Sequence, residues 1–117
     1  MGSPYRIKRV QELLRRELSD IVQHLGDPRL LMLTVVEVEV TKDLKSAKVF
    51  VSALGDKEQQ VAATAALQQA LGFVRREVAK RVSFRQVPEF TVVYDQTTER
   101  AARVGALLNQ VKAQANE

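Results

Sequence analysis

The sequence predicts an α+β fold in which a three-stranded sheet is covered on one face by helices. Apolar residues recur at spacings of three and four over residues 4–25, which is typical of an amphipathic helix. Two β-branched stretches, 31–41 and 47–53, alternate in hydrophobicity and are separated by a short connection. A long helical region then precedes a third strand over 90–94. The expected order is helix, strand, strand, two helices, strand, helix. For that order, the simplest architecture packs the helices on one face of the sheet. The long helical connection between the second and third strands permits the third strand to pair in parallel.

The first helix has clear signals at both ends. Ser3 suits an N-cap and Pro4 the first helical position. Gly26 is placed to end the helix, and Pro28 prevents it from resuming. The helix is therefore expected over residues 4–25.

The first predicted strand changes its apolar phase partway along. The apolar positions are Leu31, Leu33 and Val35, and then Val36, Val38 and Val40. Either both faces are buried early in the strand, or a β-bulge resets the phase. Residues 41–45 suit a hairpin connection to the return strand.

Glycine punctuates the second helical region. The region opens at Gly55-Asp56 and continues with an alanine-rich face. Gly72 is expected to break it and to start a separate basic helix. A residue without a Cβ lets a phosphate backbone approach closely, and a helix starting there would offer its N-terminal N–H groups to an anion. A last helix is expected from Thr97, ahead of a frayed tail over 114–117.

Composition narrows the functional classes. The 117 residues suit a single domain, 1–117, with a core over about 5–112 and flexible ends at 1–3 and 114–117. The absence of cysteine excludes disulfides and thiolate metal sites. Residues 71–86 hold five Arg or Lys and one Glu, a net charge of +4 that equals the charge of the whole chain. This segment indicates an anionic partner, and nucleic acid in particular.

Enzymatic function is not expected. His24 is the only histidine, so a metal site or a catalytic triad would lack partners for it. Glu37 and Glu39 share one face of a strand, where a solvated surface is the simpler interpretation. No catalytic residue, metal ligand, cofactor or small-molecule substrate is expected. No apolar run reaches membrane-spanning length and no secretion signal is apparent, so a cytoplasmic protein is expected. A monomer is also expected.

The order of elements, with a glycine between successive helices, resembles a type II KH domain. The motifs resemble more specifically the bacterial ribosome-binding factor A family. KH domains clamp nucleic acid with a Gly-x-x-Gly loop, but the equivalent residues 69–72 contain one glycine. The family has an Ala-x-Gly kink there, which Ala70-Leu71-Gly72 matches. The other residues that carry the resemblance are Arg6, Arg9-Val10, 18–22, Asp27-Pro28-Arg29, 34–49, 73–75, Arg85 and 87–90.

The resemblance implies a ribosome assembly factor that works by binding. Its partners would be the small ribosomal subunit, in immature and free forms, and 16S rRNA, and it would assist rRNA processing, late maturation and adaptation to cold. The expected RNA-contacting residues are Arg75, Arg76, Lys80, Arg81 and Arg85 on the basic helix, Ala70, Leu71 and Gly72 at the kink, and Arg6, Arg9, Lys42 and Lys45 as flanking contacts.

Alternatives remain open for several of these cations. Arg75 and Arg81 border the apolar stripe and could cover core edges with their stems, whereas Arg76 and Lys80 share a polar face. On the first helix Arg9 and Arg16 form one basic row, and Glu12 could instead pair with Lys8 and Arg16.

The alternative function is a protein-interaction module. It would use the exposed sheet face or the alanine-rich helix to bind a protein without touching RNA. Binding that survives high salt would favour it.

Overall fold

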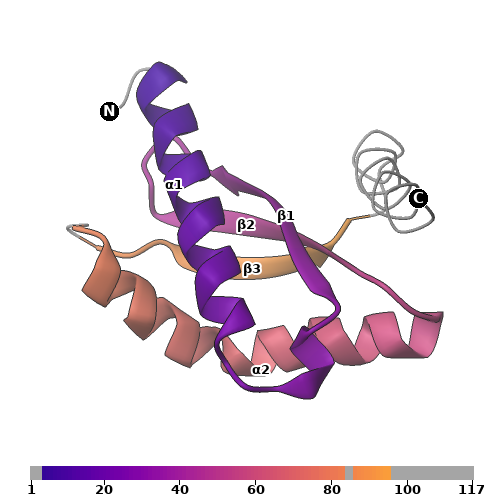
Figure 1. Ribbon diagram of the computed structural model, residues 1–117. Coiled ribbons are helices and arrows are strands. Elements are labelled where there is room, and N and C mark those ends of the chain that lie inside the picture. The colour runs from indigo at the N-terminus through magenta and orange to yellow at the C-terminus, as the bar shows by residue number, and fades with distance from the viewer. Residues whose placement is uncertain (1–3, 84–85, 96–117) are drawn as a thin grey trace, which may run out of the picture.

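The computed structural model, which describes residues 4–83 and 86–95, has the predicted α+β architecture (Figure 1). Its elements are α1 (Pro4–Gln23), the short 3-10 helix η1 (Pro28–Leu30), β1 (Leu33–Val40), β2 (Ser46–Ala53), α2 (Lys57–Arg81) and β3 (Glu89–Tyr94). The strand order is β1-β2-β3, with β1 antiparallel and β3 parallel to β2. The parallel third strand confirms what the long helical crossover permitted.

The phase change in β1 is a β-bulge. Val35 pairs with Val51 and Glu37 with Phe50, so Val36 has no residue opposite it. One extra residue resets which side chains face the core. Leu33 and Val35 before the bulge, and Val38 after it, are consequently all buried.

The first helix and first strand are both slightly shorter than predicted. α1 ends at Gln23, and Gly26 adopts a φ of +76° just beyond it. The carboxylate of Asp27 accepts a hydrogen bond from the backbone N–H of Arg29 at 2.9 Å, which caps η1. Because this turn uses residues 28–30, β1 begins at Leu33, and Leu31 is 75% exposed.

The core lies between one face of the sheet and the two helices. Side chains alternate across a strand, and the buried positions of β2 are Ala47, Val49, Val51 and Ala53, all on one face. The helical core residues are Leu14, Leu18, Ile21 and Val22 of α1 and Ala63, Ala66, Leu67, Val74 and Val78 of α2. The prediction that the helices cover one face is confirmed.

The predicted break at Gly72 is wrong. α2 opens with a capping box, in which Asp56 and Gln59 exchange side-chain and backbone hydrogen bonds at 2.8 Å, and runs as one helix of 25 residues. The glycines with positive φ among the described residues are Gly26 and Gly55, not Gly72.

Packing explains why α2 continues through its glycine. Glycine within a helix costs about 1 kcal/mol relative to alanine. Leu67 before Gly72, and Val74 and Val78 after it, enter the same core and are at most 2% exposed. Burying two or three such side chains outweighs that cost. Figure 1 shows that the axis of α2 changes direction near the middle of its length. The two helices that the sequence predicted are therefore one continuous helix with a bend.

Some expectations lie outside the described residues. These are the N-cap at Ser3, the helix from Thr97, the frayed ends and the position of Arg85. In the part of the chain that the structure describes, no helix is both long and apolar enough to cross a membrane.

Candidate nucleic-acid interface

The predicted cationic positions that the structure describes gather on one side of the molecule. They belong to the first turns of α1, the β1–β2 hairpin and the C-terminal half of α2, which Figure 1 shows on the same side. Hydrogen bonds join α1 to the hairpin end of β1, and the hairpin to the start of β3. The side chain of Gln11 accepts from the backbone N–H of Val40 at 3.1 Å, and the carbonyl of Lys45 accepts from the N–H of Glu89 at 2.9 Å. We call this side the basic end.

Arg76 and Lys80 are two exposed cations in the C-terminal half of α2. Both lie on the same side of the helix as Gly72, at spacings of four residues. A shallow hollow of about 410 Å³ is lined by Gly72, Arg75, Arg76, Ala79 and Val87. The ammonium group of Lys80 is 3.5 Å from the Glu77 carboxylate, and 73% of the Lys80 side chain is exposed. An exposed pair at that distance contributes little, so Lys80 can still bind an anion.

Arg75 is part of the scaffold of this hollow. Its guanidinium donates hydrogen bonds to the carbonyls of Val87 at 2.8 Å and Pro88 at 3.2 Å. The side chain therefore ties the segment before β3 to α2. Arg75 keeps its positive charge, but the N–H groups in these bonds are not free to contact a ligand.

Arg81 ties the two helices together. Its guanidinium donates to Asp20 at 2.5 Å and to Glu17 at 3.3 Å, both on α1. The hydrogen bond from Arg81 holds the pKa of the Asp20 carboxyl below its usual range. Two carboxylates thus offset the charge that was expected to face RNA.

Ala70 and Leu71, which were expected to contact RNA at the kink, are packing residues of α2. Both are half-buried and pack against the core. Because α2 is continuous here, its backbone N–H groups are used within the helix, and the expected N-terminal anion site at Gly72 does not form. What Gly72 offers is a helix surface without a side chain.

The hairpin presents Lys42 and Lys45 on a well-ordered turn. The Asp43 carboxylate accepts from the Thr41 hydroxyl at 2.6 Å and from the N–H of Lys45 at 3.0 Å, and Leu44 adopts a φ of 60°. The Thr41 hydrogen bond, followed by that from Lys45, lowers the pKa of Asp43. Both lysines are exposed.

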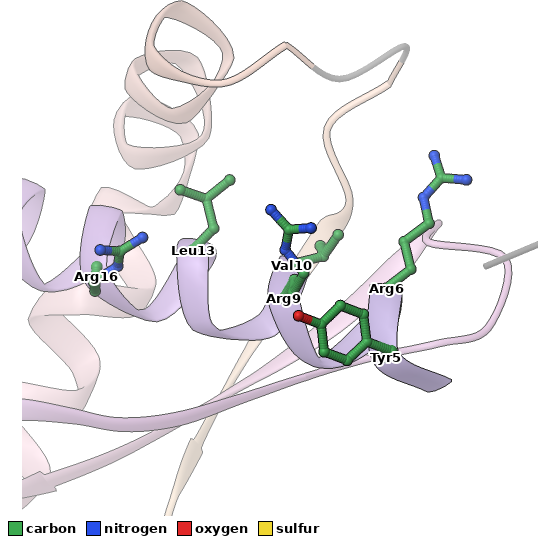
Figure 2. A pocket seen from close by; sticks show the side chains of 6 residues that line it. All are labelled: Tyr5, Arg6, Arg9, Val10, Leu13 and Arg16. Atoms are coloured by element: carbon green, nitrogen blue, oxygen red, sulfur yellow. The ribbon is translucent and has the colours of Figure 1, made fainter. Parts of the chain in front are cut away.

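The first helix carries a second hollow, of about 620 Å³, shown in Figure 2. Its lining residues are Tyr5, Arg6, Arg9, Val10, Leu13 and Arg16. The Arg9 guanidinium lies 5.8 Å from the centroid of the Tyr5 ring, a cation–π contact. Our sequence interpretation included Arg6 and Arg9 but missed Tyr5. The signal was the spacing of four residues between Tyr5 and Arg9.

Glu12 does not form the ion pairs that were considered for it. Its carboxylate bonds Arg15 at 2.5 Å, three residues along, and not Lys8 or Arg16. The hydrogen bond from Arg15 lowers the pKa of Glu12. Arg16 is therefore available on the same side as Arg9. In residues 4–83 and 86–95, no group of three or more His, Cys, Asp or Glu side chains is arranged to hold a metal ion.

The sequence pattern of the family described as ribosome-binding factor A matches residues 6–108, nearly the whole chain. The chain belongs to the ribosome-binding factor A family. A ribosome-binding factor A of Acetivibrio thermocellus is 44% identical over 111 residues, which cover 93% of this chain and 90% of the relative.

Known structures of ribosome-binding factor A superpose on this chain. The crystal structure of ribosome-binding factor A from Thermus thermophilus is 32% identical and superposes with a TM-score of 0.69, covering 75% of this chain and 93% of the other. A homology model of the Thermus thermophilus protein, fitted into a cryo-EM map of its complex with the 30S subunit, is 32% identical with a TM-score of 0.63, covering 74% and 92%. The KH-like type II fold implied by the resemblance is confirmed, with α2 continuous at the kink position.

Proposed function

We propose that this protein binds the small ribosomal subunit by docking its basic end on 16S rRNA, and that it assists rRNA processing and late maturation. The support from relatives is the Thermus thermophilus protein fitted in a 30S complex. The adaptation to cold implied by the resemblance belongs to the same proposal.

The exposed cations supply the attraction in this mechanism. Arg76 and Lys80 on α2, Lys42 and Lys45 on the hairpin, and Arg6 and Arg9 on α1 contact phosphates. Phosphate contacts position a protein without reading sequence, so specificity comes from the folded shape of the subunit. Arg75 and Arg81 act indirectly, because their internal hydrogen bonds hold the surfaces that carry the other cations.

The observation that carries the proposal is the convergence of three separate segments of the chain on one basic side. Residues 6–9, 42–45 and 76–80 are far apart in sequence, and the fold brings them together (Figure 1). A set of cations spread over a solvated surface would not require this convergence.

The test is co-sedimentation of the native protein with mature and immature small subunits at a series of salt concentrations. Roughly four to six phosphate contacts give a slope of log affinity against log salt of about −3 to −5. Binding is expected to favour the immature subunit. Salt-insensitive binding that persists with ribosomal protein alone would favour the protein-interaction alternative.

A further inference from the structure

We propose that the hollow on the first turns of α1 binds an unpaired nucleobase, which stacks on the Tyr5 ring while Arg9 and Arg16 hold the adjoining phosphates. The inference rests on the proposed function, since it names single-stranded RNA as what the α1 part of the basic end contacts. The hollow, the exposed ring and the arginines are three observations that point to one ligand chemistry.

The first observation is the exposure of Tyr5. An exposed aromatic ring is a stacking surface that accepts any base, because every base has a π-face. The side chain is 71% exposed although its ring is apolar. The Arg9 guanidinium lies over the ring at 5.8 Å from its centroid, and the exposure of the side chain leaves ring surface accessible to a ligand. Figure 2 shows the ring beside Arg9 at the end of α1.

The second observation is the arrangement of the arginines around an apolar floor. At 100° per residue, Arg9, Leu13 and Arg16 lie within one sector of the helix. Arg9 and Arg16 are about 10 Å apart along the axis. Val10 and Leu13, both half-buried, line the hollow between them. The hollow of about 620 Å³ is in the size range of small-ligand sites.

The third observation is electrostatic. Among the residues that the structure describes, those that line the hollow include three arginines and no carboxylate. The acidic side chains of α1 are engaged elsewhere: Glu12 bonds Arg15 at 2.5 Å, and Glu17 and Asp20 bond Arg81 at 3.3 and 2.5 Å. The carboxylates of the helix are thus bonded to cations other than Arg9 and Arg16, which suits the binding of an anionic backbone by these two arginines.

These features favour single-stranded over double-stranded RNA. In a duplex the faces of the bases are covered by their neighbours, and only phosphates, 2′-hydroxyls and groove edges are accessible. An exposed tyrosine next to arginines gains little from a duplex, whereas an unpaired base can stack on the exposed surface of the ring.

The absence of tryptophan from the chain allows a fluorescent reporter to be placed at the site. The variant Tyr5→Trp introduces a single indole there, and its fluorescence is measured during titration with a short unstructured RNA and with the same RNA as a duplex. The matched control is Leu31→Trp, at a position 75% exposed and remote from the basic end. We expect the single strand to quench the Tyr5→Trp variant and not the Leu31→Trp variant. The duplex, at equal saturation, should leave the fluorescence of Tyr5→Trp largely unchanged.

Affinity variants give a second readout. Tyr5→Leu should weaken single-strand binding about tenfold, the value of one stacked base, and Tyr5→Phe should restore it. Arg16→Gln should weaken binding more than Lys57→Gln, which removes an equal charge at the opposite end of the molecule from the hollow. Equal quenching of the two tryptophan variants, or an unchanged affinity of Tyr5→Leu, overturns the inference.

The experiments distinguish a failure of the base site from a failure of the proposed function. If the native protein sediments with small subunits while the Tyr5→Trp fluorescence does not respond to RNA, the proposed function stands and the base site is wrong. If that fluorescence responds to single strands while no subunit binding occurs, the base site stands and the proposed function is wrong. If the duplex quenches Tyr5→Trp as well as the single strand does, the hollow binds phosphates alone and the base site is wrong.

Discussion

Arg81 at the end of α2 donates a hydrogen bond to the carboxylate of Asp20 on α1 across 2.5 Å, linking residues 61 positions apart in the chain. The same guanidinium also reaches Glu17 at 3.3 Å. The contact fixes the C-terminal end of α2 against the last turns of α1. Arg81, which the sequence analysis expected to contact RNA, therefore links the two helices.

The Arg81–Asp20 pair should make stability depend on pH. Since the pKa of Asp20 is lowered in the folded state, the pair stabilises fully above the usual aspartate pKa of about 4, and that contribution is lost as pH falls through the lowered value. Arg81→Gln should be less stable than the native protein at neutral pH, and the difference should shrink in acid. Urea unfolding at several pH values measures this. A difference that stays constant down to strong acid would show that Asp20 does not carry the effect.

Adjacent arginines on α2 should behave differently. Arg75→Gln removes two charge-assisted hydrogen bonds to the Val87 and Pro88 carbonyls, so it should lower the free energy of unfolding by about 1–3 kcal/mol. Arg76→Gln, on the exposed side, should change stability by less than about 0.5 kcal/mol. Chemical denaturation of the two variants compares them directly. If the two variants had equal free energies of unfolding, the hydrogen bonds of Arg75 would not stabilise the fold.

Loss of the exposed α2 cations should reduce RNA binding without loss of fold. Arg76→Gln combined with Lys80→Gln should weaken binding to small subunits and lower the salt slope by about two, one for each phosphate contact. The matched control combines Arg29→Gln and Lys57→Gln, which remove the same two kinds of charge outside the basic end, in η1 and at the N-terminal end of α2. Equal effects of the two double variants would mean that overall charge, and not this surface, governs binding.

Gly72→Ala should raise stability and impair function. A Cβ at this position would meet only the Arg76 guanidinium at 3.7 Å, an ordinary contact, so alanine should stabilise the helix by up to about 1 kcal/mol. The added methyl group would project into the hollow beside Arg76 and should weaken subunit binding. Gly26→Ala is the contrast, because a φ of +76° makes alanine unfavourable by about 1–2 kcal/mol there. Thermal unfolding and co-sedimentation of both variants separate the two effects. A lower melting temperature for Gly72→Ala would contradict a continuous helix at this position and favour the break that the sequence predicted.

Local patterns in the sequence were enough to predict most elements of the fold. The period of α1, the turn at Gly26, the hairpin after Val40 and the phase change at Val36 each depend on residues a few positions apart. Periodicity and turn chemistry act at that range, so they can be recognised without the rest of the molecule. The family resemblance supplied the type of partner, and the exposed Arg76 and Lys80 lie on the polar face that helical periodicity assigned to them.

Tertiary structure decided what depends on distant residues. Gly72 does not interrupt α2, because Val74 and Val78 are buried against a sheet and a helix that a local pattern does not include. Arg75 and Arg81 look like their neighbour Arg76 in sequence, but carbonyls 12 and 13 positions away and carboxylates 61 and 64 positions away occupy them. Which cations remain exposed is a property of the packed molecule, since a side chain is engaged only by groups that folding brings within hydrogen-bond distance.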